Sequence, residues 1–172
     1  MRQTVGDMVR SMLVVLAFVA VLMLVTWRPQ PEAVKVVDPS DAIAVATAQA
    51  TFPLEAPTGL AEGWRPTSAR WEPTEKSGSD PVLHIGYVTP QDAYAQVSQS
   101  SSITDAYIAE QTREGRPVGD VAIDGVVWQR WERGDRRSLL LLEPEVTTVV
   151  SGTAAWDELT ALATSLDPAA AP

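Results

Sequence analysis

The chain has 172 residues, a net charge of −9, one histidine and no cysteine. From Pro29 onward it carries 10 basic and 21 acidic residues, a net charge of −11 that repels phosphate backbones and argues against nucleic-acid binding. The absence of cysteine excludes disulfides, thiolate metal sites, a cysteine nucleophile and lipid attachment through a thiol. An exported domain without disulfides suits a bacterial envelope.

An apolar run near the amino terminus predicts a membrane anchor over residues 12–27. Met12–Val25 has no charged side chain, and Met8–Trp27 as a helix is about 30 Å long. Trp27 and Arg28 are expected at the membrane interface. The alternative is a cleaved signal peptide, but the pair Pro31 and Ala33 makes a poor cleavage site.

The charges around the apolar run predict its orientation. Arg2 and Arg10 precede the run, whereas only Arg28 follows it closely. The positive-inside rule then predicts a single-pass cell-membrane protein with a cytoplasmic lead over residues 1–11 and an extracytoplasmic carboxyl-terminal part. On a helix Asp7 pairs with Arg10, and Ser11 bonds to the backbone, which makes these three residues candidate contacts to a membrane partner. Ordinary interfacial flanking is the alternative.

The first half of the exported part mixes helices and strands. Residues 28–37 are predicted to form a Pro-rich tether. Asp38 and Pro39 predict the start of a helix over residues 39–50, followed by a loop over 53–66. Further along the chain the patterns predict strands at 68–72, 82–88 and 94–98, and a helix over 104–112 that Thr104 caps.

The last sixty residues predict a meander and a closing helix. Strands are expected at 118–123, 126–133, 136–142 and 146–150. Asp124-Gly125 is a strong hairpin signal, and the unbroken Leu139–Leu142 run predicts a central strand covered on both faces. Thr153 is expected to cap a helix over 154–166. The fold class is therefore α+β, with a mainly antiparallel sheet packed by two or three helices, in a domain over 38–167 with a disordered tail at 168–172.

Four stretches in this order resemble one family: DMVRSM, GWRPTSARWEP, LHIGYVTP and VVSGTAAWDELTALATSL. The chain is similar over almost its whole length to an actinobacterial single-pass membrane family of unknown function, with the catalogue number four-two-four-five. The resemblance implies a single-pass envelope protein with one exported domain. The family has no assigned activity, so it implies no catalytic residue.

Catalytic and metal sites find little support in the sequence. His84 lies mid-strand on the face of Val82 and Gly86, with no nucleophile setting nearby, and is expected to be structural or on the surface. Asp80, Asp92 and Asp105 occur in turn and cap settings. We therefore expect no catalytic, cofactor-binding or metal-binding residues and no cofactor.

Two features are candidate interaction sites. Arg130, Arg133, Arg136 and Arg137, here called the basic hairpin, form a local positive patch suited to carboxylates or phosphates. The alternative is a solvated hairpin paired with the domain's own acids. Trp128 and Trp131 should take opposite faces of one strand, so that Trp131 either packs in a second core or lies at an interface.

These observations favour a non-enzymatic, membrane-anchored interaction or accessory module. Its expected partners are the lipid bilayer and either another envelope protein or an anionic envelope component, and not nucleic acid. The alternative is a small-ligand or lipid-binding domain with a pocket beneath the loop of Trp64. A hydrolase is a remote alternative.

Overall fold

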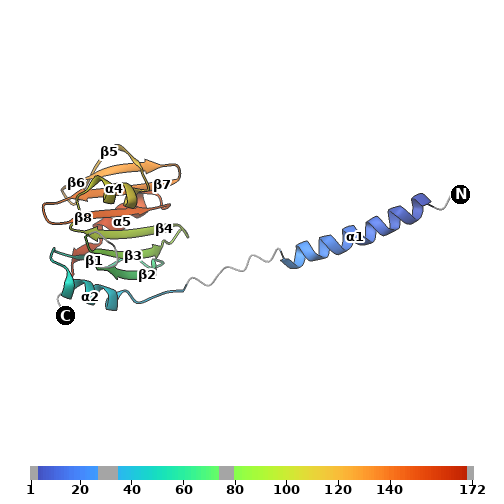
Figure 1. Cartoon of the computed structure of the whole chain (residues 1–172), viewed down its shortest axis with the longest axis horizontal. Helices are drawn as coiled ribbons and strands as arrows, with labels where there is room; N and C mark the ends of the chain where they lie inside the picture. The colour runs from blue at the N-terminus through green and yellow to red at the C-terminus, as the bar shows by residue number, and fades with distance from the viewer. Residues whose placement is uncertain (1–3, 27–34, 74–79, 170–172) are drawn as a thin grey trace. The chain divides into compact units, whose positions relative to one another are not determined.

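The computed structural model describes residues 4–26, 35–73 and 80–169 (Figure 1). Its contacts divide the chain into two units, Met1–Ala33 and Val34–Pro172. The first unit contains helix α1, Thr4–Thr26. The second contains the other described helices and every described strand.

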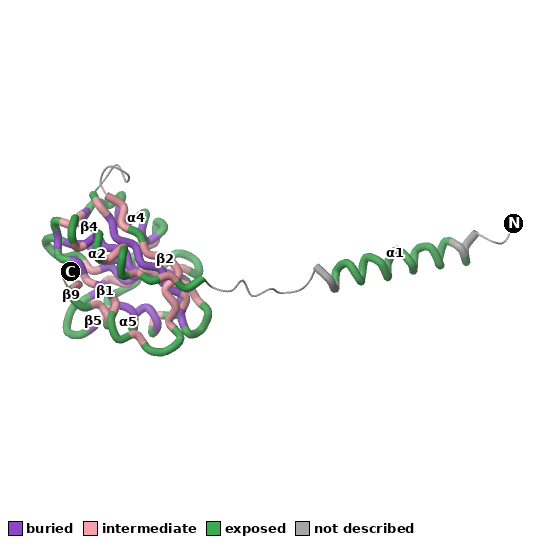
Figure 2. Tube along the Cα trace, turned by 90° about the horizontal axis from the view of Figure 1, so that it is seen from below, coloured by how far each residue is buried: buried purple, intermediate pink, exposed green. Residues whose placement is uncertain are grey.

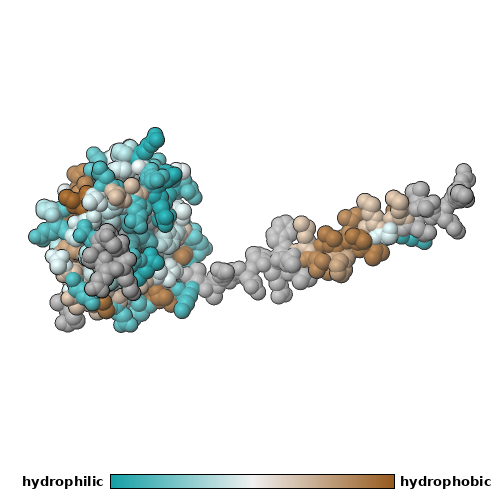
Figure 3. Space-filling view, viewed as in Figure 1, coloured by the Kyte–Doolittle hydropathy of each residue, from teal (hydrophilic) through white to brown (hydrophobic). Residues whose placement is uncertain are grey.

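Helix α1 covers most of the predicted anchor, and Ser11 Oγ donates to the Met8 carbonyl at 3.0 Å, as expected. Its apolar side chains are exposed within this unit, for example Phe18 at 65% (Figure 3). Within residues 4–26, 35–73 and 80–169, however, no helix has the combined length and apolarity needed to cross a membrane. The predicted interfacial pair Trp27 and Arg28, and the side chain of Asp7, lie outside the described residues.

The second unit is built on a seven-stranded antiparallel sheet in the order β2-β3-β4-β8-β7-β6-β5, with three helices and a two-stranded sheet around it (Figure 1). The prediction of an α+β fold with a mainly antiparallel sheet is confirmed. The large sheet contains β2 (Arg65–Glu72), β3 (Val82–Val88), β4 (Tyr94–Ser100), β5 (Arg116–Ile123), β6 (Val126–Arg133), β7 (Arg136–Leu142) and β8 (Thr147–Gly152). The remaining elements are α2 (Ser40–Gln49), α4 (Asp105–Thr112), α5 (Trp156–Thr164), β1 (Glu55–Pro57) and β9 (Leu166–Pro168).

Local sequence signals explain several of these boundaries. Asp124 and Gly125 have φ values of 50° and 84°, the left-handed conformation that a tight hairpin between β5 and β6 requires. Thr104 caps α4 by accepting a hydrogen bond from the Tyr107 amide at 3.3 Å. Asp38 accepts from the Ser40 amide at 2.9 Å, although the residue in the N-cap position of α2 is Pro39. The capping predictions for α2 and α4 therefore hold to within one residue.

Both faces of the large sheet are covered, which buries two separate cores (Figure 2). Leu139 belongs to the core that includes Leu159 and Leu162 of α5. The next residue, Leu140, faces the opposite way and packs with Tyr107 and Ile108 of α4. Because β7 lies between β8 and β6, the prediction that the leucine run is a central, doubly covered strand is confirmed.

The sequence predictions fail at three places. Residues 53–66 were expected to form a loop and 168–172 a tail, yet Glu55 pairs with Pro168 in the β1–β9 sheet. The last helix begins at Trp156 with Ala155 as its N-cap residue, later than predicted. Thr153 does not cap it, because its hydroxyl accepts a hydrogen bond from the Tyr94 amide at 3.1 Å. The β1–β9 pairing and the role of Thr153 both involve a partner distant in sequence.

Candidate functional site

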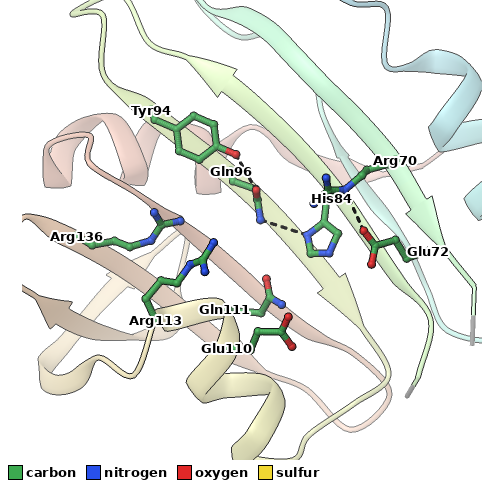
Figure 4. A pocket seen from close by; sticks show the side chains of 9 residues that line it. All are labelled: Arg70, Glu72, His84, Tyr94, Gln96, Glu110, Gln111, Arg113 and Arg136. Atoms are coloured by element: carbon green, nitrogen blue, oxygen red, sulfur yellow. Dashed lines mark hydrogen bonds and ion pairs between the residues drawn. The ribbon is translucent and has the colours of Figure 1, made fainter. Parts of the chain in front are cut away.

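A polar cavity of about 400 Å³ lies on the α4 face of the large sheet (Figure 4). Strands β2, β3, β4 and β7 and helix α4 contribute its walls. The lining side chains are all polar or charged: Arg70, Glu72, His84, Tyr94, Gln96, Glu110, Gln111, Arg113 and Arg136. We call this the polar cavity.

A hydrogen-bonded network forms the wall along β3 and β4. Tyr94 Oη donates to Gln96 Oε1 at 2.7 Å, which fixes the side-chain amide of Gln96. The Gln96 Nε2 group then lies 3.2 Å from His84 Nδ1 and 2.7 Å from Ser98 Oγ. Gly86 makes this arrangement possible, because a Cβ atom there would lie 2.9 Å from Tyr94 Oη. The polar side chains of this wall are therefore already hydrogen-bonded to one another.

His84 is buried, with 8% of its surface exposed, so it is not a surface histidine. Burial lowers the pKa of its imidazole below the ordinary value of 6.5 and favours the neutral ring. Since Gln96 Nε2 donates to Nδ1, the ring proton is on Nε2. His84 therefore serves the cavity as a neutral hydrogen-bond donor, which agrees with the expected structural role.

Arg113 and Arg136 bring two guanidinium groups to one end of the cavity (Figure 4). Neither side chain takes part in an ion pair or hydrogen bond among residues 35–73 and 80–169. Arg136 Nε is buried and has no acceptor. Burial, and next the positive charge of Arg113, lower the pKa of Arg136. Tyr94 and Asp135 act on that pKa in the opposite direction. Two guanidinium groups at one end of the cavity, one of them with a buried Nε that has no acceptor, form a site suited to an anion.

Local geometry positions Arg113. This residue ends α4 in the left-handed conformation, with φ 57° and ψ 47°. Arg133 Nη1 donates to the Arg113 carbonyl at 2.5 Å and to Glu114 Oε2 at 2.7 Å. The end of α4 is thereby fixed to the β6–β7 hairpin that carries Arg136.

The acidic groups of the cavity lie apart from this pair. Glu72 forms an ion pair with Arg70, with 3.0 Å between Oε1 and Nε. Glu110 is exposed and belongs to none of the ion pairs found within 4.0 Å among the described side chains. The three aspartates considered from the sequence, Asp80, Asp92 and Asp105, do not line the cavity.

The one histidine–serine contact of this site is unsuited to nucleophilic catalysis. Ser98 Oγ lies 3.0 Å from His84 Nδ1, but Ser98 is completely buried and cannot reach a substrate. Among residues 4–26, 35–73 and 80–169, no group of three or more histidine or acidic side chains is arranged to hold a metal ion.

The structure divides the predicted basic hairpin between the two faces of the sheet. Arg133 and Arg136 are cross-strand partners on the α4 face, and only Arg136 lines the cavity. On the opposite face the Arg130 guanidinium lies 4.9 Å from the ring centroid of Trp156. Arg137 Nε lies 3.9 Å from Glu132 Oε1 on that face. The four arginines therefore do not form one patch, because alternation along a strand turns neighbours apart.

The tryptophans serve mainly as core residues. Trp128, 4% exposed, packs in the α5-side core, whereas Trp131 packs on the opposite side against the core that contains Tyr107. Their predicted placement on opposite faces is confirmed. Trp64 contacts Tyr87 edge-to-face with 6.0 Å between ring centroids and is partly buried against the α5-side core.

Sequence reasoning missed most of the polar cavity. A signal for it exists in β4, where Tyr94, Gln96 and Ser98 alternate with the buried apolar residues Ala95 and Val97. The alternation predicts a polar face on β4, but such a face is commonly solvated in an antiparallel sheet, so the pattern indicates one wall of the cavity and not the cavity itself. No local sequence pattern predicts that residues of α4 and β7 line the same cavity.

Comparisons with known proteins give the family of this chain. None of the curated proteins matches it. Two solved structures show a weak similarity at 19% identity and a TM-score of 0.41: a crystal structure of MucB in complex with MucA(peri), and the Pseudomonas aeruginosa MucA/MucB complex. They cover 69% and 72% of this chain, which spans only 37% and 38% of theirs.

The family model described as "Protein of unknown function (DUF4245)" matches residues 1–166, which is nearly the whole chain. The chain belongs to that family, as its sequence motifs had indicated.

Proposed function

We propose that this protein is a non-enzymatic interaction module whose polar cavity binds an anionic group of a ligand or partner. The observation that carries the proposal is the pair Arg113 and Arg136, with the buried Nε of Arg136 lacking an acceptor. Leaving a buried charged donor unpaired costs about 1–3 kcal/mol. A bound anion supplies the missing acceptors.

The chemistry of the pair fits a carboxylate or a phosphate group. A guanidinium presents parallel N–H donors that match the two oxygens of such a group. Neutral His84 lines the same cavity and offers a further donor. Pockets of about 300–1,000 Å³ hold small ligands, so a volume of about 400 Å³ accommodates a small molecule or one side chain of a larger partner.

The surrounding charge also favours this site over the rest of the surface. The lining residues comprise three arginines and two glutamates, a net charge of +1 with His84 neutral. The chain from Pro29 onward has a net charge of −11. A local positive potential in an otherwise negative protein directs an anion to one place.

Calorimetry with two probe anions tests the proposal. The full-length protein is titrated with N-acetylglycylglycine and with inorganic phosphate, and compared with the variants Arg113→Gln, Arg136→Gln and Arg116→Gln. We expect each cavity variant to bind about tenfold more weakly, which corresponds to ~1.4 kcal/mol. Arg116 is exposed on β5 and does not line the cavity, so its variant should bind like the wild type. Equal binding by all variants, or no binding of either anion, contradicts the proposal.

The proposed anion site also predicts which substitutions disrupt binding to a protein partner. In-cell crosslinking followed by mass spectrometry identifies proteins near the full-length chain. Arg136→Glu should abolish a specific crosslinked partner, because it places a negative charge in the cavity. Arg116→Glu should retain that partner, because Arg116 is exposed on β5 and does not line the cavity. Retention of the partner by Arg136→Glu, or its loss with Arg116→Glu, would contradict binding of the partner at the cavity.

The cellular location is a separate proposal. We infer from the sequence that residues 8–27 associate with the cell membrane and that residues 35–169 lie on its extracytoplasmic side. The support is the apolar run, the exposed apolar side chains of α1 and the positive charges before the run. An envelope partner follows from that location.

The lack of natural cysteine allows a direct test of location. Single variants Gln3→Cys and Asp120→Cys are exposed to a membrane-impermeant maleimide in intact spheroplasts and after lysis. Labelling of Asp120→Cys before lysis, and of Gln3→Cys only after lysis, supports the proposed orientation. Equal protection of both positions before lysis contradicts it.

A further inference from the structure

The polar cavity holds a carboxylate as well as the two guanidinium groups, and these opposite charges are not paired with each other. Glu110 lines the same cavity as Arg113 and Arg136 (Figure 4). The ion pairs within 4.0 Å among the described side chains include none of the three residues. Charges that share a cavity usually neutralise one another, so their separation needs an explanation.

The backbone at the end of α4 provides that explanation. Glu110 and Arg113 are three residues apart, a spacing at which opposite charges pair on a regular helix. Arg113, however, has left-handed φ and ψ angles of 57° and 47°, so it no longer follows the helix. The hydrogen bond from Arg133 to the Arg113 carbonyl keeps it there. The fold thus holds the two charges apart.

We propose that the ligand of the polar cavity is a zwitterion, with a singly charged anionic group at Arg113 and Arg136 and an ammonium group at Glu110. This inference rests on the proposed function and adds the second, positive group of the ligand. Amino acids and short peptides have this chemistry, and so do zwitterionic lipid headgroups. One small ligand of this class satisfies the unpaired charges at both places in the cavity.

The charge balance favours a monoanion with an ammonium group over a multiply charged anion. Arg70 and Glu72 neutralise each other, which leaves two arginines and Glu110. A second negative charge on the ligand would approach Glu110 within a strongly acidic protein. An ammonium group instead meets a carboxylate that has no partner among the described ion pairs.

A matched set of probe ligands tests the contributions of the ligand's carboxylate and of its ammonium group one at a time. The full-length protein is titrated with glycylglycine, with N-acetylglycylglycine, which lacks the ammonium group, and with glycylglycinamide, which lacks the carboxylate. Glycerophosphoethanolamine and its N-acetylated form make the equivalent pair for a lipid headgroup. Glu110→Gln removes the negative charge at similar size, and Glu145→Gln, at an exposed position outside the cavity, is its control.

We expect one of the two zwitterions to bind at least about tenfold more tightly than its singly charged analogues. Glu110→Gln should remove that preference without weakening binding of the N-acetylated anion, and Glu145→Gln should keep the preference. Preference for glycylglycine indicates that the natural ligand is an amino acid or a peptide. Preference for glycerophosphoethanolamine indicates a lipid headgroup. If the N-acetylated anion binds as tightly as the zwitterion in wild type and Glu110→Gln alike, the zwitterion proposal is overturned while the anion site stands. If no probe binds, the proposed function itself fails.

Discussion

Gln96 and His84 are joined by a hydrogen bond of 3.2 Å between Gln96 Nε2 and His84 Nδ1 in the wall of the polar cavity. This contact requires a neutral imidazole, because a protonated ring has a proton on Nδ1 and offers no acceptor. Burial acts in the same direction by lowering the pKa of His84 from 6.5. The wall of the cavity is therefore sensitive to acid.

The contact predicts how stability depends on pH. In the unfolded chain the histidine binds a proton near pH 6.5, whereas the folded chain resists protonation to a lower pH. The free energy of unfolding is therefore undiminished above 6.5 and falls as the pH drops below that value. Urea denaturation between about pH 7.5 and 5.5 should show a smaller loss for His84→Gln than for the wild type. Equal losses in both proteins would show that His84 is not buried in a neutral form.

Replacing Arg136 should stabilise the free protein while it removes binding. Arg136→Met retains the apolar stem of the side chain and eliminates a buried donor that has no acceptor. We expect the free energy of unfolding without ligand to rise by about 1 kcal/mol. Arg116→Met, at an exposed position, should change it by less than about 0.5 kcal/mol. A loss of stability on changing Arg136 would instead assign that residue a structural role.

Much of the fold follows from local sequence signals. The strands of the meander, the Asp124-Gly125 hairpin and the opposite orientation of Trp128 and Trp131 each depend on residues close together in the chain. The β1–β9 sheet joins segments more than 100 residues apart, and no local pattern marks it. The polar cavity depends on β2, β3, β4, β7 and α4 meeting on one face, so local sequence patterns predict the polar face of β4 but not the cavity.

The central position of β7 predicts a strong contrast between two leucines of the same strand. Leu139 is fully buried, whereas Leu142 at the end of the strand is 46% exposed. Leu139→Ala should lower the free energy of unfolding by about 2–5 kcal/mol through lost contacts and a cavity. Leu142→Ala should cost less than about 1 kcal/mol. Similar losses measured by urea denaturation would mean that the meander is not covered on both faces.

The contact between Arg130 and Trp156 predicts that part of the basic hairpin is structural. The guanidinium carbon lies 4.9 Å from the ring centroid of Trp156, in the range of a cation–π interaction. A double-mutant cycle with Arg130→Met and Trp156→Leu should give a coupling energy of about 0.5–1 kcal/mol in unfolding. Arg130→Met should leave binding of N-acetylglycylglycine unchanged. Additive effects in the cycle, together with weaker anion binding, would favour a binding role for Arg130.

The central claim is that an anion binds at the unpaired guanidinium of Arg136. Nuclear magnetic resonance of the full-length protein in a non-ionic detergent resolves the Nε–H signals of arginine side chains. Arg130 provides an internal control, because its Nε is also buried without an acceptor but lies on the opposite face of the sheet. On titration with N-acetylglycylglycine, the account predicts a saturable shift of the Arg136 signal and an unchanged Arg130 signal. A stationary Arg136 signal, or equal shifts at both arginines, would contradict it.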